Sequence, residues 1–405
     1  MKKILIVGGG VNQMPLIKAS KKEGYEVIVV DYAGEKCPAY GIADRLYNVS
    51  TQDEGAVLDV ARKEDVDGII SNSEPSMLIV NSIAEKLDLI GNPVEGVRNL
   101  MAKSKFRDLQ RRAGCYAPKC YEVETAEEAI VVSKRLSCPF IVKPCESSAS
   151  RGFRRIERYD QLEISDAFQA CYHYSRNKKV VIEEYVTMPS LQTIEGDIFV
   201  FGDSVIWDGL FCTTRASWAP MVPMTYSAPM CIGELKREQL KSAILRVFKA
   251  SGVRFGEFNI EGYFTETGEF FIIEINVRQG GNFLPLFLHR YTGIDYDRLL
   301  VMTCVNEDEY LNTVMASEHR RRFSMMHSVY SQKEGLYQGL KFESLVKSKI
   351  TDIRELLSVG DKVERCVDGT SILASVDLEF DSLEELYDFT PKMADCIHVE
   401  LVNAS

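Results

Sequence analysis

Residues 256–282, GEFNIEGYFTETGEFFIIEINVRQGGN, contain the pattern that decides the fold. Two runs of alternating apolar and polar residues flank Thr267-Gly268, and this arrangement predicts a β-hairpin with a two-residue turn. The register set by such a turn pairs polar residues across the hairpin: Glu261 with Glu274, Asn259 with Asn276, and Glu257 with Arg278.

The polar face of this hairpin has the composition of a site for a hard metal ion. Side chains alternate along a strand, so the polar residues share one face and the apolar ones face the core, namely Phe258, Ile260, Ile273 and Ile275. Opposed carboxylates lie about 5 Å apart and repel each other unless a cation bridges them. Carboxylate and amide oxygens without a nearby His or Cys favour Mg²⁺ or Mn²⁺ over zinc. We therefore expect a metal at Glu261, Glu274 and Asn276, with a solvated polar face as the alternative.

Two upstream strands carry further candidate groups. Residues 138–153, CPFIVKPCESSASRGF, end a short apolar strand at Lys143 and continue into a loop of small residues. Small residues let backbone N–H groups close over phosphate oxygens while a lysine adds charge. The loop is not a Walker A sequence, and an ordinary loop is the alternative. A second apolar strand, VVIEEYV at residues 180–186, carries Glu183 and Glu184.

The two ends of the chain predict different architectures. Residues 1–97 alternate apolar runs with helical stretches, which predicts a parallel sheet covered by helices. Gly8-Gly9-Gly10 follows the first run, but the third glycine of a dinucleotide fingerprint would fall at Gln13, so a nicotinamide site is a weak alternative. Residues 306–405 carry no motif for a site, and the run Arg320 to Arg322 is interpreted as a solvated face.

Size and composition limit the classes of function. A chain of 405 residues predicts two to four subdomains. The net charge of -11 and the scattered basic residues argue against a nucleic-acid surface. No window approaches the roughly 18 apolar residues of a membrane span. Eleven cysteines without a CxxC pair indicate reduced thiols and a cytoplasmic protein.

The order and spacing of these elements resemble the ATP-grasp superfamily over about residues 1 to 300. The elements are Lys103 before Gly114, IVKP with its small loop, IEEYV, and Glu261 followed by EINVR. The segment after Arg278 is most similar to the carboxylate–amine ligase branch, which includes amino-acid ligases and purine-carboxylase-like and carbamoyl-phosphate-synthase-like enzymes. The expected fold is α/β and α+β multidomain: a Rossmann-like domain at 1–97, an ATP-grasp domain at 98–305 with a lid lobe at about 115–187, and a small α+β subdomain at 306–405.

The resemblance also implies roles for individual residues. Those implied to bind ATP are Lys103, Lys143, Ser147, Ser148, Ser150, Gly152, Glu183, Glu184 and Val186, with Glu183 meeting the adenine amino group. It implies that Glu261, Glu274 and Asn276 hold the metal, and that Arg278 and Lys143 are catalytic. Gln192 departs from the pattern, because relatives often carry a Glu near this position, and the loop lacks the usual glycines.

The implied activity is ATP-dependent amide formation between a carboxylate and an amine through an acyl phosphate, releasing ADP and phosphate. Candidate substrate residues are Arg215, Trp218, Tyr226, Gly280, Gly281 and Asn282, and Gly8 to Gly10 and Ser71 to Glu74 also qualify. The rivals are a carboxyphosphate or formate-activating purine-pathway enzyme, a non-catalytic ATP sensor, and a nicotinamide oxidoreductase. The expected partners are small molecules, with a homodimer suggested by analogy.

Overall fold

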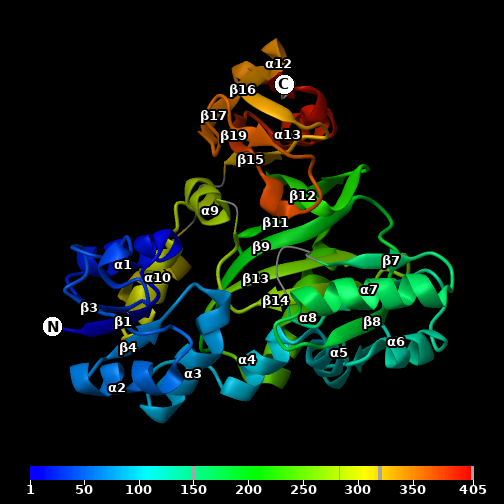
Figure 1. Cartoon of the computed structure of the whole chain (residues 1–405). Helices are drawn as coiled ribbons and strands as arrows, with labels where there is room; N and C mark the ends of the chain where they lie inside the picture. The colour runs from blue at the N-terminus through cyan, green and yellow to red at the C-terminus, as the bar shows by residue number, and fades with distance from the viewer. Residues whose placement is uncertain (147–151, 282, 318–321, 403–405) are drawn as a thin grey trace.

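The N-terminal part of the chain is a parallel sheet covered by helices. The computed structural model describes residues 1–146, 152–281, 283–317 and 322–402 (Figure 1). The strands lie in the order β3-β2-β1-β4. Their bounds are Lys3–Val7 for β1, Glu26–Val30 for β2, Arg45–Tyr47 for β3 and Gly68–Ile70 for β4, with helices α1 (Met14–Lys22), α2 (Glu54–Glu64) and α3 (Met77–Lys86) between them. β1 and β2 are apolar and buried along nearly their whole length, as expected for strands covered on both faces.

The chain returns to this sheet from far along the sequence. After the predicted hairpin come α9 (Leu284–Thr292), α10 (Tyr296–Thr303) and α11 (Glu309–Ala316). α10 shares a hydrophobic core with β1 and α1, beside which it lies in Figure 1. A side chain at Gly68 would lie 2.8 Å from the carbonyl oxygen of Cys304, so the backbones approach closely here. The predicted boundaries at residues 97 and 305 stay predictions, and α10 packs on the part of the chain that precedes the first of them.

A small antiparallel lobe follows α4 (Val94–Met101) and α5 (Lys103–Arg112). Its strands lie in the order β5-β8-β6-β7. They are β5 (Cys120–Val123), β6 (Phe140–Pro144), β7 (Arg154–Ile156) and β8 (Val180–Glu184), with helices α6 (Ala126–Ser133) and α7 (Gln161–Tyr174). The lobe has its own hydrophobic core, which includes Phe140, Ile164 and Phe168. The packing of the lobe is therefore largely internal to it.

The largest sheet joins the middle of the chain to its C-terminal part. The strands run in the order β14-β13-β9-β11-β12-β15-β19-β17, all antiparallel, with β10 (Ser204–Ile206) beside β9. Their bounds are β9 Gln192–Phe201, β11 Leu210–Ala216, β12 Ala219–Ala228, β13 Phe255–Phe264, β14 Phe270–Asn276, β15 Phe323–Val329, β17 Ile350–Glu355 and β19 Ala374–Phe380. Helix α8 (Glu234–Ser251) packs against the β13 end of the sheet.

The C-terminal end adds a second small sheet above this one. Its strands, in the order β18-β16-β20, are β16 (Gly335–Phe342), β18 (Lys362–Val363) and β20 (Ile397–Val402), with helices α12 (Ser344–Lys347) and α13 (Leu383–Phe389). All eleven cysteines lie in the described ranges and are free thiols. No helix within those ranges is both long and apolar enough to cross a membrane.

The hairpin has the predicted register at two of the three polar pairs, but not the predicted turn; β14 ends at Asn276, before the predicted pair of Glu257 with Arg278. Glu261 pairs with Glu274 and Asn259 with Asn276. The turn is longer than two residues: Thr265 N donates to Glu269 O, and Phe264 pairs with Phe270. A bulge between Glu261 and Gly262 compensates for the shifted register. It leaves Ile273 as the extra residue on β14, so the prediction that Ile273 faces the core is wrong: its side chain lines a cavity.

Two glycines set how closely β9 and β11 approach beside this hairpin. Gly196 has a φ of +139°, and a Cβ there would lie 1.9 Å from the carbonyl oxygen of Gly209. A Cβ at Gly209 would in turn lie 2.1 Å from the carbonyl oxygen of Asp197. Gly196 separates Glu195 from Asp197, so this close approach positions two acidic side chains of β9.

We predict that Gly196→Ala lowers the free energy of unfolding by about 3 kcal/mol or more, because the new methyl group meets backbone and the positive φ is strained. Gly202→Ala is the matched control: its φ is +62°, and no atom lies within 4 Å of the added Cβ. Gly202→Ala should lower the free energy of unfolding by about 1 kcal/mol, because only the backbone conformation is unfavourable for alanine there. Urea unfolding of both variants checks this, and equal losses would contradict the role of the close approach.

Candidate active site

A cavity of about 650 Å³ lies between the small lobe and the polar face of the hairpin. Its walls come from α5, β6 and β8 on one side and from β9, β11, β13 and β14 on the other. Twelve of the predicted site residues line it: Lys103, Lys143, Glu183, Glu184, Val186, Arg215, Tyr226, Glu261, Glu274, Asn276, Arg278 and Gly281.

Three other predicted residues, all within the described ranges, are not among those lining the cavity. Gly152 lies beside α7, where its carbonyl oxygen accepts a hydrogen bond from Cys171 Sγ. Trp218 packs in a separate hydrophobic cluster with Val222 and Tyr330. The backbone N–H of Gly280 donates to the buried carboxylate of Asp197. Four further predicted residues lie outside the described part of the chain: Ser147, Ser148, Ser150 and Asn282.

One end of the cavity is a slot with apolar and aromatic walls. Val186, Tyr263 and Phe271 form one cluster with Met188 and Ile273. The rings of Tyr263 and Phe271 pack edge to face with centroids 5.4 Å apart, and Tyr263 Oη donates to Val186 O at 2.7 Å. The bulge described above brings Ile273 into this wall. A planar apolar ring is the kind of group that such a slot accepts.

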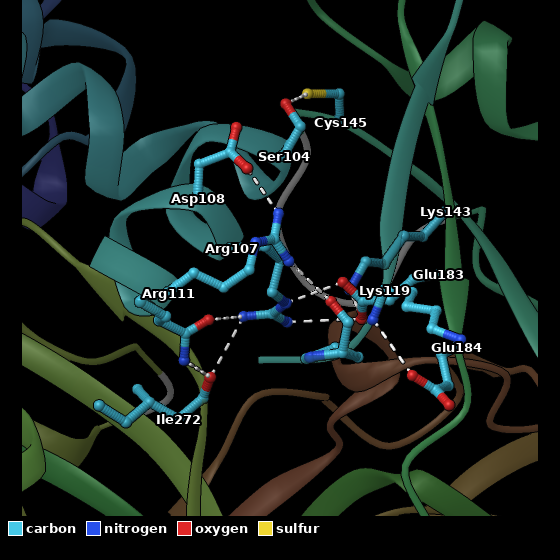
Figure 2. Close-up of polar contacts among 12 residues, drawn as sticks. Ser104, Arg107, Asp108, Arg111, Lys119, Lys143, Cys145, Glu183, Glu184 and Ile272 are labelled. Atoms are coloured by element: carbon cyan, nitrogen blue, oxygen red, sulfur yellow. Dashed lines mark hydrogen bonds and ion pairs between the residues drawn. The ribbon is translucent and has the colours of Figure 1, made fainter. Parts of the chain in front are cut away.

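Buried charges lie beside this slot (Figure 2). Lys143 Nζ lies 2.5 Å from Glu183 Oε1, and Arg107 Nε lies 2.8 Å from Glu183 Oε2. Burial alone would raise the pKa of Glu183, but the charges and hydrogen bonds of Arg107 and Lys143 outweigh it and lower the pKa to about 2. Burial also lowers the pKa of Lys143; Glu183 opposes this shift and Arg107 adds to it. In this structure Glu183 is thus an ionised partner of two cations.

The opposite wall carries a row of three carboxylates on adjacent strands. Glu195 on β9 lies opposite Glu261 on β13, which lies opposite Glu274 on β14. The guanidinium of Arg215 enters the row from β11, with Nη2 at 2.5 Å from Glu195 Oε1 and 2.6 Å from Glu261 Oε1. Burial raises the pKa of Glu261 above its usual range; Arg215 opposes the shift, and Glu195 and Glu274 add to it. Arg215, predicted to meet substrate, is therefore held by two carboxylates of the wall.

The donor atoms at the Glu274 end of the row suit a hard divalent cation. Asn276 Nδ2 donates to Glu274 Oε1 at 2.8 Å, which leaves the amide oxygen of Asn276 as a further possible ligand. Within the described residues, no three acidic, histidine or cysteine side chains converge on one point. The predicted set consists instead of two carboxylates and an amide. It matches the oxygen-rich chemistry that Mg²⁺ takes in proteins.

Arg278, at the end of the hairpin, meets an acid from the N-terminal part of the chain. Glu74 begins a short 3-10 helix (Glu74–Ser76) after β4. Its Oε2 lies 3.5 Å from Arg278 Nη2, and its Oε1 lies 2.6 Å from Nη2 of Arg176, which follows α7 in the lobe. Burial alone would raise the pKa of Glu74, but Arg176, Arg278 and Lys103 outweigh it and lower the pKa. Glu74 thus connects three parts of the chain at the cavity.

Residues of the C-terminal part also line the cavity. Gly369 and Thr370 line it together with Pro220, Pro223 and Leu284. Asp368 holds this loop, because its Oδ1 accepts hydrogen bonds from Thr370 N and Thr370 Oγ1. The C-terminal residues therefore contribute to a site that no motif in their sequence indicated.

Protein-family models match both the N-terminal part of the chain and the part that supplies most of the cavity. The model of the PylC-like N-terminal domain matches residues 4–94, and that of the ATP-binding domain of the carbamoyl-phosphate synthase L chain matches residues 102–282. The chain is 28% identical over 200 residues to a formate-dependent phosphoribosylglycinamide formyltransferase of Sulfolobus acidocaldarius, covering 48% of this chain and 49% of that protein. It is 27% identical over 316 residues to the N-terminal section of the carbamoyl phosphate synthase large chain of Methanopyrus kandleri, covering 68% and 52%.

The chain thus matches two family models and has homologues in the carboxylate–amine ligase branch of the ATP-grasp superfamily. It spans about half the length of the curated relatives it matches. Solved structures share the ATP-grasp fold: an L-amino acid ligase from Bacillus licheniformis has a TM-score of 0.78 at 20% identity, covering 100% of this chain and 99% of that one. A phosphoribosylglycinamide synthetase from Anaerococcus prevotii has a TM-score of 0.69 at 18% identity, covering 99% and 100%. The predicted fold class is confirmed.

Sequence reasoning did not assign the roles of several charged residues in or beside the cavity. Glu195 lies three residues after Gln192, the position where the family pattern led us to look for an acid, and alternation along β9 is the signal that could have found it. Glu74 fell within a stretch considered for substrate contact, but its pairing with Arg176 and Arg278 depends on distant parts of the chain. Arg107 was not singled out, because it is one of several charged residues in α5.

We predict that Arg215→Met lowers the free energy of unfolding by about 3–5 kcal/mol, because it leaves the buried carboxylates of Glu195 and Glu261 without a cation. Mg²⁺ should then raise the thermal midpoint of this variant more than that of the wild type. Arg112→Met, at the exposed end of α5, is the control and should change stability by about 0.5 kcal/mol or less. Calorimetric scans with Mg²⁺ and with a chelator check both points, and an equal response to Mg²⁺ would contradict the interpretation of the carboxylate row.

Proposed function

We propose that the chain is an ATP-dependent carboxylate–amine ligase that forms an amide through an acyl phosphate and releases ADP and phosphate. One observation carries the proposal. The same cavity is lined by the apolar slot, by Lys103 and Lys143, by the carboxylate row and by Arg278. Phosphoryl transfer needs positioning and charge neutralisation more than it needs a protein nucleophile. This set of side chains supplies both.

The proposed roles follow the position of each group. The purine ring lies in the slot of Val186, Tyr263 and Phe271, and Lys103 and Lys143 meet the phosphates. Glu261, Glu274 and Asn276 hold a divalent cation, with Mg²⁺ preferred over Mn²⁺, and when bound it neutralises phosphate charge and orients the phosphates. Domain boundaries at 97 and 305, and a lid lobe at about 115–187, belong to the same proposal.

The reaction then takes two steps. A substrate carboxylate oxygen attacks the γ-phosphorus, the bond from the γ-phosphorus to the bridging oxygen breaks, and ADP leaves. The amine nitrogen next attacks the carbonyl carbon of the acyl phosphate; the C–N bond forms, the C–O bond to phosphate breaks, and the amine gives up a proton. Arg278 stabilises the charge on the transferring phosphoryl group and on the leaving phosphate. The enclosing walls limit hydrolysis of the acyl phosphate by water.

The second candidate function differs from the first in the acid that reacts with ATP. Relatives of the chain include a formate-dependent formyltransferase and a carbamoyl phosphate synthase, so formate and bicarbonate belong in the test beside amino acids. The free thiols support a reducing cytoplasm as the compartment. A homodimer is proposed by analogy, and analytical ultracentrifugation tests it.

We predict ADP release with Mg-ATP that requires one carboxylate and one amine, measured with amino acids singly and in pairs, and with formate and bicarbonate plus an amine. Glu274→Gln and Arg278→Ala should each reduce the rate by about 100-fold or more, because each removes charge stabilisation of the transferring group. Glu266→Gln, in the exposed turn of the same hairpin, is the control and should retain the wild-type rate.

Two results would count against this prediction. Activity that survives Glu274→Gln would contradict the metal site. Tight ATP binding without turnover on any tested acid would favour the non-catalytic sensor.

A further inference from the structure

Arg107 is a fully buried arginine in the middle of α5. Its side chain is 1% exposed, although the helix is otherwise rich in exposed charged residues. Lys103 lies four residues earlier, so both cations project from the same face of the helix. The guanidinium carbon lies 4.9 Å from the centroid of the Phe271 ring, in the wall of the slot. Burying an arginine costs free energy unless its donors and charge are matched.

The hydrogen bonds of Arg107 join the two walls of the cavity (Figure 2). Nε and Nη2 donate to the carboxylate of Glu183 on β8, at 2.8 and 3.4 Å. Nη1 donates to Ile272 O on β14, at 3.2 Å, and to Gln110 Oε1, at 2.8 Å. Gln110 Nε2 donates to the same Ile272 carbonyl at 2.8 Å. The side chain of Arg107 therefore fixes β8 of the lobe relative to β14 of the hairpin. The uncharged side chain of Gln110 also donates a hydrogen bond to β14.

The charges of this cluster do not cancel. Arg107 and Lys143 are two cations that share one carboxylate, Glu183, so the cluster carries one net positive charge. Arg107, Lys143 and Glu183 all line the cavity. If Arg107 were neutral, Glu183 and Lys143 would form a balanced pair. An anion would then have to separate that pair before it could bind Lys143.

We propose that Arg107 is a positioning residue for the nucleotide. Its ion pair with Glu183 keeps the cluster at one net positive charge, and this charge is available at Lys143 to bind the phosphates. The inference rests on the proposed function, because it assumes that ATP is the anion. A second consequence follows from the geometry. Removing Glu183 together with Arg107 leaves Lys143 as the one charge of the cluster and restores the original net charge.

The experiment is titration calorimetry with the magnesium complex of the non-hydrolysable ATP analogue AMP-PNP. Arg107→Met should weaken binding by about tenfold or more, and Arg107→Met/Glu183→Gln should bind at least about fivefold more tightly than the single variant. Arg107→Lys, which keeps the charge, should stay within about fivefold of the wild type. If Arg107→Met does not fold, Arg107→Gln takes its place, because it removes the charge and keeps a donor.

Two controls separate this role from a structural one. Gln110→Leu removes an uncharged support of the same Ile272 carbonyl and should lower the thermal midpoint while leaving AMP-PNP affinity within about twofold. Arg111→Met removes an exposed arginine that pairs with Asp108 on the same helix, and should not change the affinity. A double variant that binds no better than Arg107→Met, or a Gln110→Leu variant that loses as much affinity, would overturn the inference. Failure of the wild type to bind AMP-PNP would overturn the proposed function as well.

Discussion

Buried charge that must be matched across distant parts of the chain is the constraint on which the cavity depends. Glu183 of the lobe is held by Arg107 of α5 and Lys143 of β6. Arg215 of β11 is held by Glu195 and Glu261 of two other strands. Glu74 of the N-terminal part is held by Arg176 and Arg278. Removing the member that the others share, Glu183, Arg215 or Glu74, leaves uncompensated charge, so these ion pairs help to set the relative positions of the elements.

The sheet makes this matching possible because its strands present side chains in rows. Glu195, Glu261 and Glu274 form one row, and Asp197, Asn259 and Asn276 form the next. The close approach at Gly196 and the bulge before Gly262 keep these rows in register, while the bulge sends Ile273 into the apolar slot. The same strand pair thus supplies both the polar wall and part of the apolar wall.

Local pattern was enough to predict the parts of this site that depend on neighbouring strands. The pairing of Glu261 with Glu274 was predicted from alternation and an assumed two-residue turn, and it is correct although that turn was wrong. The turn is longer than two residues and the bulge compensates, so two errors cancelled at the residues that matter. Ile273 shows the limit, because a bulge changes the face of a single residue and leaves little trace in an alternating sequence. Arg107 was missed for another reason, because it gains its role from contacts with Glu183 and Ile272, which lie far away in the chain.

The matched charges also determine what kind of ligand the cavity can accept. Most cations that line it already have an acidic partner, so a monoanion would exchange one ion pair for another with little net gain. A polyphosphate is different, because it brings several charges at once and can engage the net positive cluster at Lys143 together with Lys103 and Arg278. In the proposed site, a divalent cation at the carboxylate row would offset the repulsion that Arg215 relieves at one side. The arrangement of ion pairs therefore favours a metal-bound polyphosphate over a simple anion. A polyphosphate forms more new ion pairs with the cavity than it breaks, whereas a simple anion does not.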